Sequence, residues 1–222
     1  MINTYIITGP YGGGKTEFCV NLALKTAAET GKVIIADLDV VNPYFRSREK
    51  AEKLAPRGIE VMGDCLNNNT GQDLPAVSYA FLSHLRRGDN VIIDLAGGTL
   101  GLNLLASCYE AVRKISYEFL CVLNLFRPET GSAEKMADFV REINAKSKIA
   151  VTGLVNNGHM LHGTTAEHVL ASQAAILAAG EELNLPLKYT LVRQNVYDTI
   201  KSEIKSEKEI TFDSMIMRES WQ

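Results

Sequence analysis

A glycine-rich octapeptide near the start of the chain places the strongest constraint on its fold. The residues Gly9-Pro10-Tyr11-Gly12-Gly13-Gly14-Lys15-Thr16 follow the β-branched, apolar run 4–8 and precede a segment of helical period. A strand, a Gly-x-x-x-x-Gly-Lys-Thr turn and a helix in this order are typical of the phosphate-binding loop (P-loop) of nucleotide-binding α/β proteins. The sequence therefore predicts a P-loop fold that binds a nucleotide with Mg²⁺.

The residue types of this loop suit phosphate binding. Glycines let consecutive backbone N–H groups point inward because no Cβ obstructs them, and three of them stand at 12–14. We expect Lys15 to reach the β- and γ-phosphates and to act in catalysis, and Thr16 to place its hydroxyl on Mg²⁺. The predicted nucleotide contacts of the loop are Gly9, Pro10, Tyr11, Gly12, Gly13, Gly14, Lys15, Thr16 and Glu17.

Short aliphatic runs alternate with longer segments of helical period along the chain. This order is typical of parallel strands joined by crossover helices, and strands covered on both faces are apolar throughout. The predicted strands are 4–8, 33–37, 91–94, 118–124, 149–155 and 187–192, with a weaker one at 59–62. The predicted helices are 16–29, 45–54, 75–86, 102–112, 133–144, 166–182 and 196–208. We therefore predict an α/β fold with a doubly wound, mostly parallel sheet and helices on both faces.

The remaining composition is that of an ordinary globular protein. No repeat or long Pro/Gly-rich linker interrupts the 222 residues, so we predict one domain over 1–222. The net charge of −3 gives no general reason to expect a nucleic-acid partner, and no apolar stretch approaches the roughly 20 residues that cross a bilayer. Without a signal segment or paired cysteines, the chain is expected to be soluble and cytoplasmic. The mixed charges of 201–209 predict a solvated terminal helix.

Acidic residues end two further predicted strands. Asp94 closes an apolar run, which places it at the sheet edge that also carries the P-loop. Asp37 and Asp39 leave the end of the second strand. We expect Asp94 and Asp37 to support Mg²⁺ together with Thr16, and Asp39 to orient the attacking water. A turn or helix-capping role for Asp37 or Asp39 is the alternative.

Together these motifs resemble the SIMIBI class of P-loop proteins, in particular the branch of MinD, ParA and the nitrogenase iron protein. That branch carries a DxD after its second strand, and the interval from Lys15 to Asp39 is similar to its interval between the P-loop lysine and the switch I aspartate. The resemblance implies a Mg-ATP-dependent protein with switch I at 42–49. The segment 37–49 also resembles a DLDxVNPYFRxRE block found in a group of bacterial ATP-binding proteins.

The same resemblance suggests where the base would bind. Those ATPases contact adenine through an asparagine after a late strand, which implies a base contact from Asn156 or Asn157. Arg193, after the last predicted strand, is a further candidate, with an ordinary surface arginine as the alternative. A plain turn is the alternative for Asn-Asn-Gly, because asparagine tolerates left-handed backbone geometry. The chain lacks the Asn/Thr-Lys-x-Asp guanine signature of related GTPases, which favours ATP over GTP.

One departure from the family concerns dimerisation. MinD and ParA proteins carry a signature lysine directly after the first P-loop glycine and use it across a nucleotide-sandwich dimer, whereas Pro10 stands here. Arg46 and Arg48 are candidates for a substitute charge, supplied in cis or by a homodimer partner. Pairing with Glu49 or Glu52 on the same helix is the alternative.

Three functions fit these features, and fold alone does not separate them. The first is a slow ATPase switch in which nucleotide binding orders the segments 37–48 and 94–101 and so controls a protein partner. The second is an ATP-dependent small-molecule kinase or ligase similar to dethiobiotin synthetase. The third is a nucleotide sensor without turnover.

Overall fold

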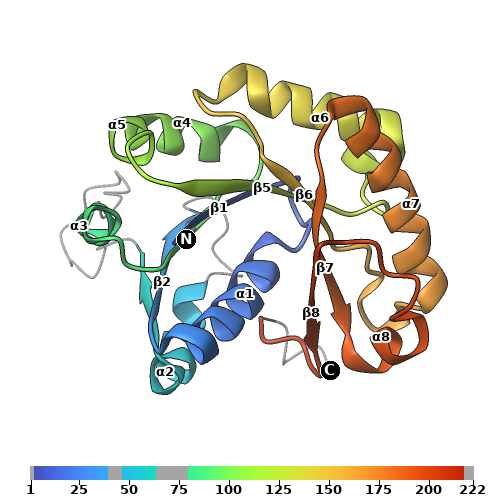
Figure 1. Ribbon diagram of the computed structural model, residues 1–222, viewed down its shortest axis with the longest axis horizontal. Coiled ribbons are helices and arrows are strands. Elements are labelled where there is room, and N and C mark those ends of the chain that lie inside the picture. The colour runs from blue at the N-terminus through green and yellow to red at the C-terminus, as the bar shows by residue number, and fades with distance from the viewer. Residues whose placement is uncertain (1–2, 40–46, 64–79, 218–222) are drawn as a thin grey trace, which may run out of the picture.

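The computed structural model describes residues 3–39, 47–63 and 80–217. Its described strands form one sheet with the order β3-β2-β4-β1-β5-β6-β7-β8, and every pairing between them is parallel (Figure 1). The strands are β1 (Thr4–Thr8), β2 (Val33–Leu38), β3 (Ile59–Met62), β4 (Val91–Leu95), β5 (Tyr117–Leu123), β6 (Gly153–Asn156), β7 (Leu187–Arg193) and β8 (Lys208–Phe212). The predicted α/β fold with a doubly wound parallel sheet is confirmed.

Helices cover both faces of this sheet (Figure 1). The helices are α1 (Lys15–Thr30), α2 (Ala51–Leu54), α3 (Phe81–Arg87), α4 (Thr99–Ser107), α5 (Tyr109–Val112), α6 (Ala133–Lys146), α7 (Ala166–Leu183) and α8 (Gln194–Ile200). Apolar residues of α3 to α7 pack on one face, and those of α1 and α2 pack on the other. α8 packs against α7 and β7 in a smaller cluster.

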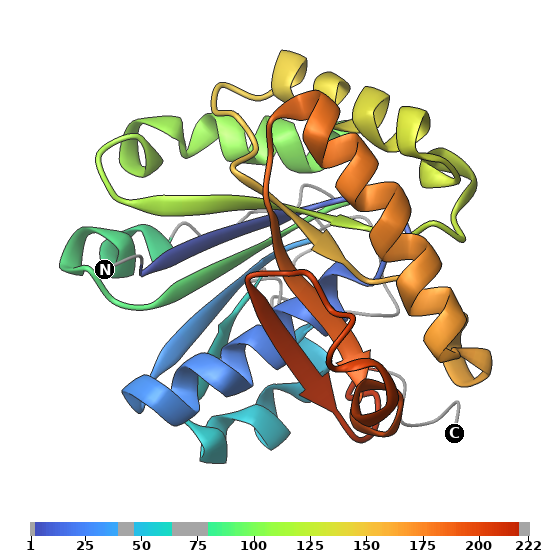
Figure 2. The same cartoon turned by 45° about the vertical axis from the view of Figure 1, so that its right-hand side comes forward.

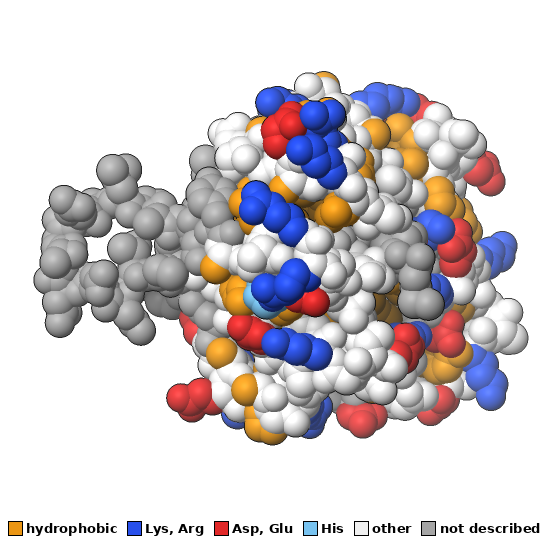
Figure 3. All heavy atoms as spheres, turned by 60° about the vertical axis from the view of Figure 1, so that its left-hand side comes forward, with side chains coloured by type: hydrophobic (Ala, Val, Ile, Leu, Met, Phe, Trp, Pro, Cys, Tyr) orange, Lys and Arg blue, Asp and Glu red, His pale blue; other side chains and the backbone are white. Residues whose placement is uncertain are grey.

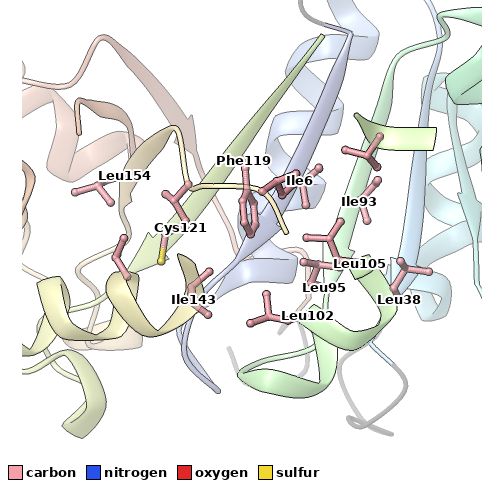
Figure 4. Packing of buried hydrophobic residues seen from close by; sticks show 14 of the residues in the cluster. Ile6, Leu38, Ile93, Leu95, Leu102, Leu105, Phe119, Cys121, Ile143 and Leu154 are labelled. Atoms are coloured by element: carbon pink, nitrogen blue, oxygen red, sulfur yellow. The ribbon is translucent and has the colours of Figure 1, made fainter. Parts of the chain in front are cut away.

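Two apolar cores follow from the alternation of side chains along each strand. Ile6, Ile93 and Phe119 point to the face covered by α4 and α6, where they meet Leu105 and Ile143 (Figure 4). Their neighbours in sequence point to the α1 face. There the rings of Phe18 and Tyr189 pack edge-on, with 5.6 Å between their centroids. Burial on both faces leaves the carboxyl ends of the strands as the edge where polar groups can gather.

The end of the chain contradicts one prediction. The predicted helix 196–208 stops at Ile200, and the helix expected over 201–209 is wrong, because a turn and a loop follow and lead into β8, which starts at Lys208 and pairs with β7 in parallel (Figure 2). Ile210 is buried on the α1 face, while Lys208 and Glu209 are exposed. Residues 201–207 thus form a turn and a loop, and only Lys208 and Glu209 of the charged run lie in the edge strand β8, where exposed charges discourage further strand pairing.

Other predicted helices differ in extent. The predicted helix 102–112 is two helices, α4 and α5, which meet at Cys108. In the predicted helix 45–54, residues 47–50 form a 3₁₀ turn before the four-residue α2, and 45–46 lie outside the described residues. Of the predicted helix 75–86, only residues from 80 onward are described, and α3 begins at Phe81.

The described surface mixes charges of both signs. Lys and Arg side chains alternate with Asp and Glu side chains over the face seen in Figure 3. None of the helices in the described ranges combines the length and the apolar character needed to cross a bilayer. Three cysteines of the described part, Cys19, Cys108 and Cys121, are buried free thiols.

Candidate nucleotide site

The P-loop runs from the end of β1 to the start of α1 and has the backbone that its glycines permit. Gly14 has a φ of 85°, and a Cβ there would collide with Nδ2 of Asn157. Gly9 has a φ of 154°, and a Cβ there would collide with the carbonyl oxygen of Val122. Gly14 is also the N-cap of α1, and none of the described side chains caps the helix. The first N–H groups of α1 therefore point at the loop without a capping side chain, which is the arrangement that binds phosphate.

Lys15 lies inside the loop. Its Nζ donates to the carbonyl oxygen of Pro10 at 3.1 Å, and the residue is only 6% exposed. If Gly97, just after β4, carried a Cβ, that carbon would stand 3.2 Å from the same Nζ. The ammonium thus lies between the P-loop and the turn after β4, where a phosphate bound to the loop would meet it.

Asp94 and Asp37 stand side by side on neighbouring strands. They are register partners in the β2–β4 pair, and both are buried. Burial, reinforced by the charge of Asp37 and opposed by that of Lys15, raises the pKa of the Asp94 carboxyl to about 7. These two carboxylates, both predicted from the sequence as metal ligands, therefore share an environment that is unfavourable to negative charge unless a cation joins them.

Asp37 and Asp39 differ in their contacts. Asp37 accepts a hydrogen bond from the backbone N–H of Asp39 and another from Oγ of Ser47, both at 3.1 Å. Asp37 thus ties the end of β2 to the 3₁₀ turn that starts at Ser47. Asp39 is 6% exposed and lines the pocket beside the P-loop.

The oxygen donors at this edge fit Mg²⁺. Both carboxylate oxygens of Asp94 are buried without a hydrogen-bond partner in the described part of the chain, although a buried carboxylate ordinarily requires one. The Thr16 hydroxyl is close enough to lower the pKa of Asp94. Among the described residues no group of three or more His, Cys, Asp or Glu side chains could hold a metal. This donor set suits Mg²⁺, which is usually held by one or two carboxylates, waters and substrate phosphates.

A pocket opens beside the loop, with about 1050 Å³ of empty volume that includes the solvent at its mouth. The end nearest the loop is lined by Tyr11, Gly12, Gly14, Lys15, Thr16 and Asp39. The far end is mostly apolar and is lined by Val169, Leu191, Val192, Phe212, Met215 and Met217. A charged end next to an apolar end matches the phosphates and the base of a nucleotide.

The two asparagines after β6 have different surroundings. The side chain of Asn156 is fully buried, donates to the carbonyl of Val169 at 3.1 Å and accepts from the N–H of Gly158 at 3.0 Å. Asn157 lines the pocket, and its Nδ2 donates to the carbonyl of Gly13 at 2.9 Å. Asn156 therefore shapes the turn, whereas Asn157 joins the P-loop to the base end.

Arg193 and Glu17 also line the pocket, at the end of β7 and at the start of α1. Nε of Arg193 is buried and has no hydrogen-bond partner among the residues that the structure describes. Glu17 does not point at the loop, because its carboxylate accepts from the N–H groups of Ile216 and Met217, each at 2.9 Å. Arg46 lies outside the described residues, as does the side chain of Arg48, so the substitute charge predicted for them stays a prediction.

Arg127, which the sequence analysis did not identify, lies against the P-loop. Its guanidinium carbon is 3.6 Å from the place that a Cβ on Gly12 would take, and its buried Nε meets no acceptor in the described ranges. Arg127 follows β5, the neighbour of β1 in the sheet. Its place just after the carboxyl end of a predicted strand is the signal that could have identified it.

Comparison with known proteins gives structural likenesses only. No protein-family model matches the chain, and no curated protein matches it. Chloroplast FtsY from Physcomitrella patens is 26% identical, with a TM-score of 0.57 over 86% of this chain and 58% of that chain. FtsY from Thermotoga maritima is 23% identical, with a TM-score of 0.54 over 86% of this chain and 61% of that chain.

A further similar structure contains a bound nucleotide. The signal recognition particle receptor FtsY from Elizabethkingia anophelis, in complex with GDP, is 19% identical, with a TM-score of 0.52 over 86% of this chain and 57% of that chain. The chain thus spans less than two thirds of the length of these proteins. These likenesses show a P-loop α/β fold for this chain, and the likeness to the Physcomitrella patens FtsY supports its place in the SIMIBI class.

Proposed function

We propose that the chain binds Mg-ATP in this pocket and hydrolyses it slowly as a switch that acts on a protein partner. The observation that carries the proposal is the buried Asp94 carboxylate, which pairs in register with Asp37 on the neighbouring strand and lies close enough to Lys15 and Thr16 for both to lower its pKa. Such a group is costly in the absence of a cation and is compensated when Mg²⁺ and phosphate arrive together. Binding of Mg-nucleotide is thereby linked to the stability of this sheet edge.

Adenine suits the base end better than guanine does. The Asn/Thr-Lys-x-Asp guanine signature is missing, and Asn156-Asn157-Gly158-His159 follows β6 instead. Among the described residues of the pocket lining, the carboxylates are those of Glu17 and Asp39. Glu17 already accepts two backbone N–H groups, and Asp39 follows β2 at the phosphate end. We therefore assign ATP, with GTP as the competitor to test because one FtsY was crystallised with GDP.

The proposed reaction is attack of water on the γ-phosphorus, with cleavage of its bond to the oxygen that bridges to the β-phosphate. Lys15 neutralises the charge that develops on the transferred group, and the N–H groups of the loop hold the β-phosphate. Asp39 would orient the water and accept its hydrogen bond, and Thr16 with Asp94 would hold Mg²⁺. When bound, Mg²⁺ would supply neutralisation of the phosphate charge.

A second cation near the phosphates supports turnover without the signature lysine. Arg127 lies against Gly12 with a donor that no group in the described chain satisfies. A guanidinium offers several donors and is always charged, so it suits phosphate recognition. We assign Arg127 as this cation in cis, whereas the nucleotide-sandwich homodimer of the MinD and ParA branch uses a lysine in trans.

The proposed switch depends on Asp37. Its bonds to Ser47 and to the Asp39 N–H connect the metal site to the end of β2 and to the following 3₁₀ turn. Exchange of ATP for ADP changes the charge next to this connection, which is the kind of change that reorders switch segments. Within the SIMIBI class we place the chain in the MinD and ParA branch, because the interval from Lys15 to Asp39 is similar to the interval between the P-loop lysine and the switch I aspartate of that branch.

Steady-state hydrolysis and equilibrium binding test this function together. Wild-type protein should bind Mg-ATP more tightly than Mg-GTP and hydrolyse ATP slowly to ADP and phosphate. Asp39→Asn should keep ATP binding but lose hydrolysis. The exposed Asp138→Asn serves as the matched control. Tighter binding of GTP would overturn the base assignment. Full hydrolysis by Asp39→Asn would overturn the role of Asp39, and phosphorylation of an added metabolite in place of ADP release with phosphate would favour a kinase.

A further inference from the structure

The first turn of α1 holds a distant part of the chain through one carboxylate. Oε1 of Glu17 accepts from the N–H of Ile216 and Oε2 accepts from the N–H of Met217, both at 2.9 Å. Nδ2 of Asn21, one turn along α1, donates to Oε1 at 3.0 Å and so fixes the carboxylate from the other side. Hydrogen bonds to an ionised acceptor are about twice as strong as neutral ones, so this contact holds the backbone of 216–217 firmly in place.

The same segment forms a wall of the pocket. After β8 ends at Phe212, the chain turns so that Met215 and Met217 are 7% and 9% exposed and line the pocket together with Leu191. Met217 also packs into the core on the α1 face, whereas Asp213 and Ser214 are exposed. Methionine side chains adapt to irregular surfaces and make favourable contacts with aromatic rings, which suits the flat face of a base.

We infer that Glu17 is a positioning residue that builds the base site by holding the segment 213–217 against the pocket. The inference rests on the proposed nucleotide function and deepens it. Glu17, which also lines the pocket, acts in this role through the backbone N–H groups of Ile216 and Met217. It directly follows Thr16 in sequence, so one helical turn supports both ends of the ligand: Lys15 and Thr16 at the phosphates, and the Glu17-held wall at the base.

Two ligands separate the two ends of the site. ATP would contact both the P-loop and the wall formed by 213–217. Inorganic tripolyphosphate has the phosphates without the base, so it would contact the P-loop alone. Loss of the Glu17 hydrogen bonds should therefore weaken ATP and spare tripolyphosphate. A defect in α1 or the P-loop would weaken both ligands equally.

The experiment is calorimetric titration of Mg-ATP and Mg-tripolyphosphate into wild-type protein, Glu17→Gln and the control Glu29→Gln, which alters an exposed residue of the same helix. Glu17→Gln should bind ATP about tenfold more weakly, the scale of a lost hydrogen bond to a charged group, and tripolyphosphate within about twofold of wild type. Amide hydrogen exchange at Ile216 and Met217 should become faster in Glu17→Gln only.

A second variant acts on the wall without touching α1. Met215→Ala should reproduce the selective loss of ATP affinity while the amides of 216 and 217 stay protected. Equal weakening of ATP and tripolyphosphate in Glu17→Gln would overturn the inference, as would unchanged ATP affinity despite faster exchange. Failure of wild-type protein to bind either ligand would overturn the proposed function itself and the inference with it.

Discussion

Replacing Asp94 by asparagine should make the metal-free, nucleotide-free protein more stable at alkaline pH relative to wild type. The folded-state pKa of the Asp94 carboxyl is about 7, raised by burial and by Asp37 from the ordinary value of 3.8. At about 1.36 kcal/mol per pKa unit, the shift of about 3 units corresponds to a penalty of about 4 kcal/mol once the pH exceeds both values. Asparagine is close in shape and carries no charge, so it avoids this penalty.

The sign and pH window follow from proton linkage. Between the two pKa values the folded protein keeps a proton that the unfolded chain has released, so the stability of the wild type falls as the pH rises. From pH 5 to pH 8 the fall is about 2.5 kcal/mol, or roughly 5–10 °C in the melting temperature of a chain of this size. The cost of the asparagine amide is independent of pH. Because Asp37 is coupled to Asp94, the measured difference belongs to the pair.

Thermal and urea unfolding of wild type and Asp94→Asn at pH 5 and pH 8, with EDTA present, measure this difference. The free energy of unfolding of the variant, relative to that of the wild type, should rise by about 2.5 kcal/mol from pH 5 to pH 8. Mg-ATP should stabilise the wild type at pH 8 and do little for the variant. The reasoning would be refuted if the stability difference between the two proteins did not change with pH. It would also be refuted if the wild type became more stable relative to the variant from pH 5 to pH 8.

The remaining predictions concern the loop and its neighbours. Gly14→Ala should abolish ATP binding because its Cβ would collide with Asn157, whereas Gly31→Ala, with a similar φ but no described atom within 4 Å, should cost only about 1–2 kcal/mol of unfolding free energy and leave titrated ATP affinity intact. Asn157→Ala should lower ATP affinity about fivefold by freeing the Gly13 carbonyl, and an unchanged dissociation constant would argue against that contact. Arg127→Ala should lower the single-turnover hydrolysis rate about tenfold or more, and Arg127→Lys should restore part of it. An unchanged hydrolysis rate in Arg127→Ala would contradict the role of Arg127 as a cation in cis.

The phosphate end of the site was predictable because its chemistry is local. The spacing of the P-loop fixes Lys15 and Thr16 relative to α1, and an aspartate that ends a buried strand must lie at the carboxyl edge of the sheet. Asp94 was therefore identified without any tertiary information. Its closeness to Asp37 was expected from their shared metal role, whereas their direct pairing depends on the register between β2 and β4 and required the structure.

The base end was less predictable because distant segments build it. The contact between Glu17 and the backbone of 216–217 spans almost the whole chain, and the residues of this wall carry no motif. β8 was hidden for a related reason, since an exposed edge strand with mixed charges has the composition of a surface helix. For Asn156 and Asn157, the residue types were informative, but only the packing of Asn156 under α7 separates the two.

Calorimetric titration of Mg-ATP into wild type and Lys15→Ala tests the central claim most directly. Lys32→Ala, which removes a lysine that pairs with Glu60 on the exposed surface, is the matched control. The account predicts saturable binding to the wild type and to Lys32→Ala, and at least a roughly tenfold loss of affinity in Lys15→Ala, as expected when a buried cation no longer meets the phosphates. Wild-type affinity in Lys15→Ala would contradict the assignment of the P-loop as the nucleotide site.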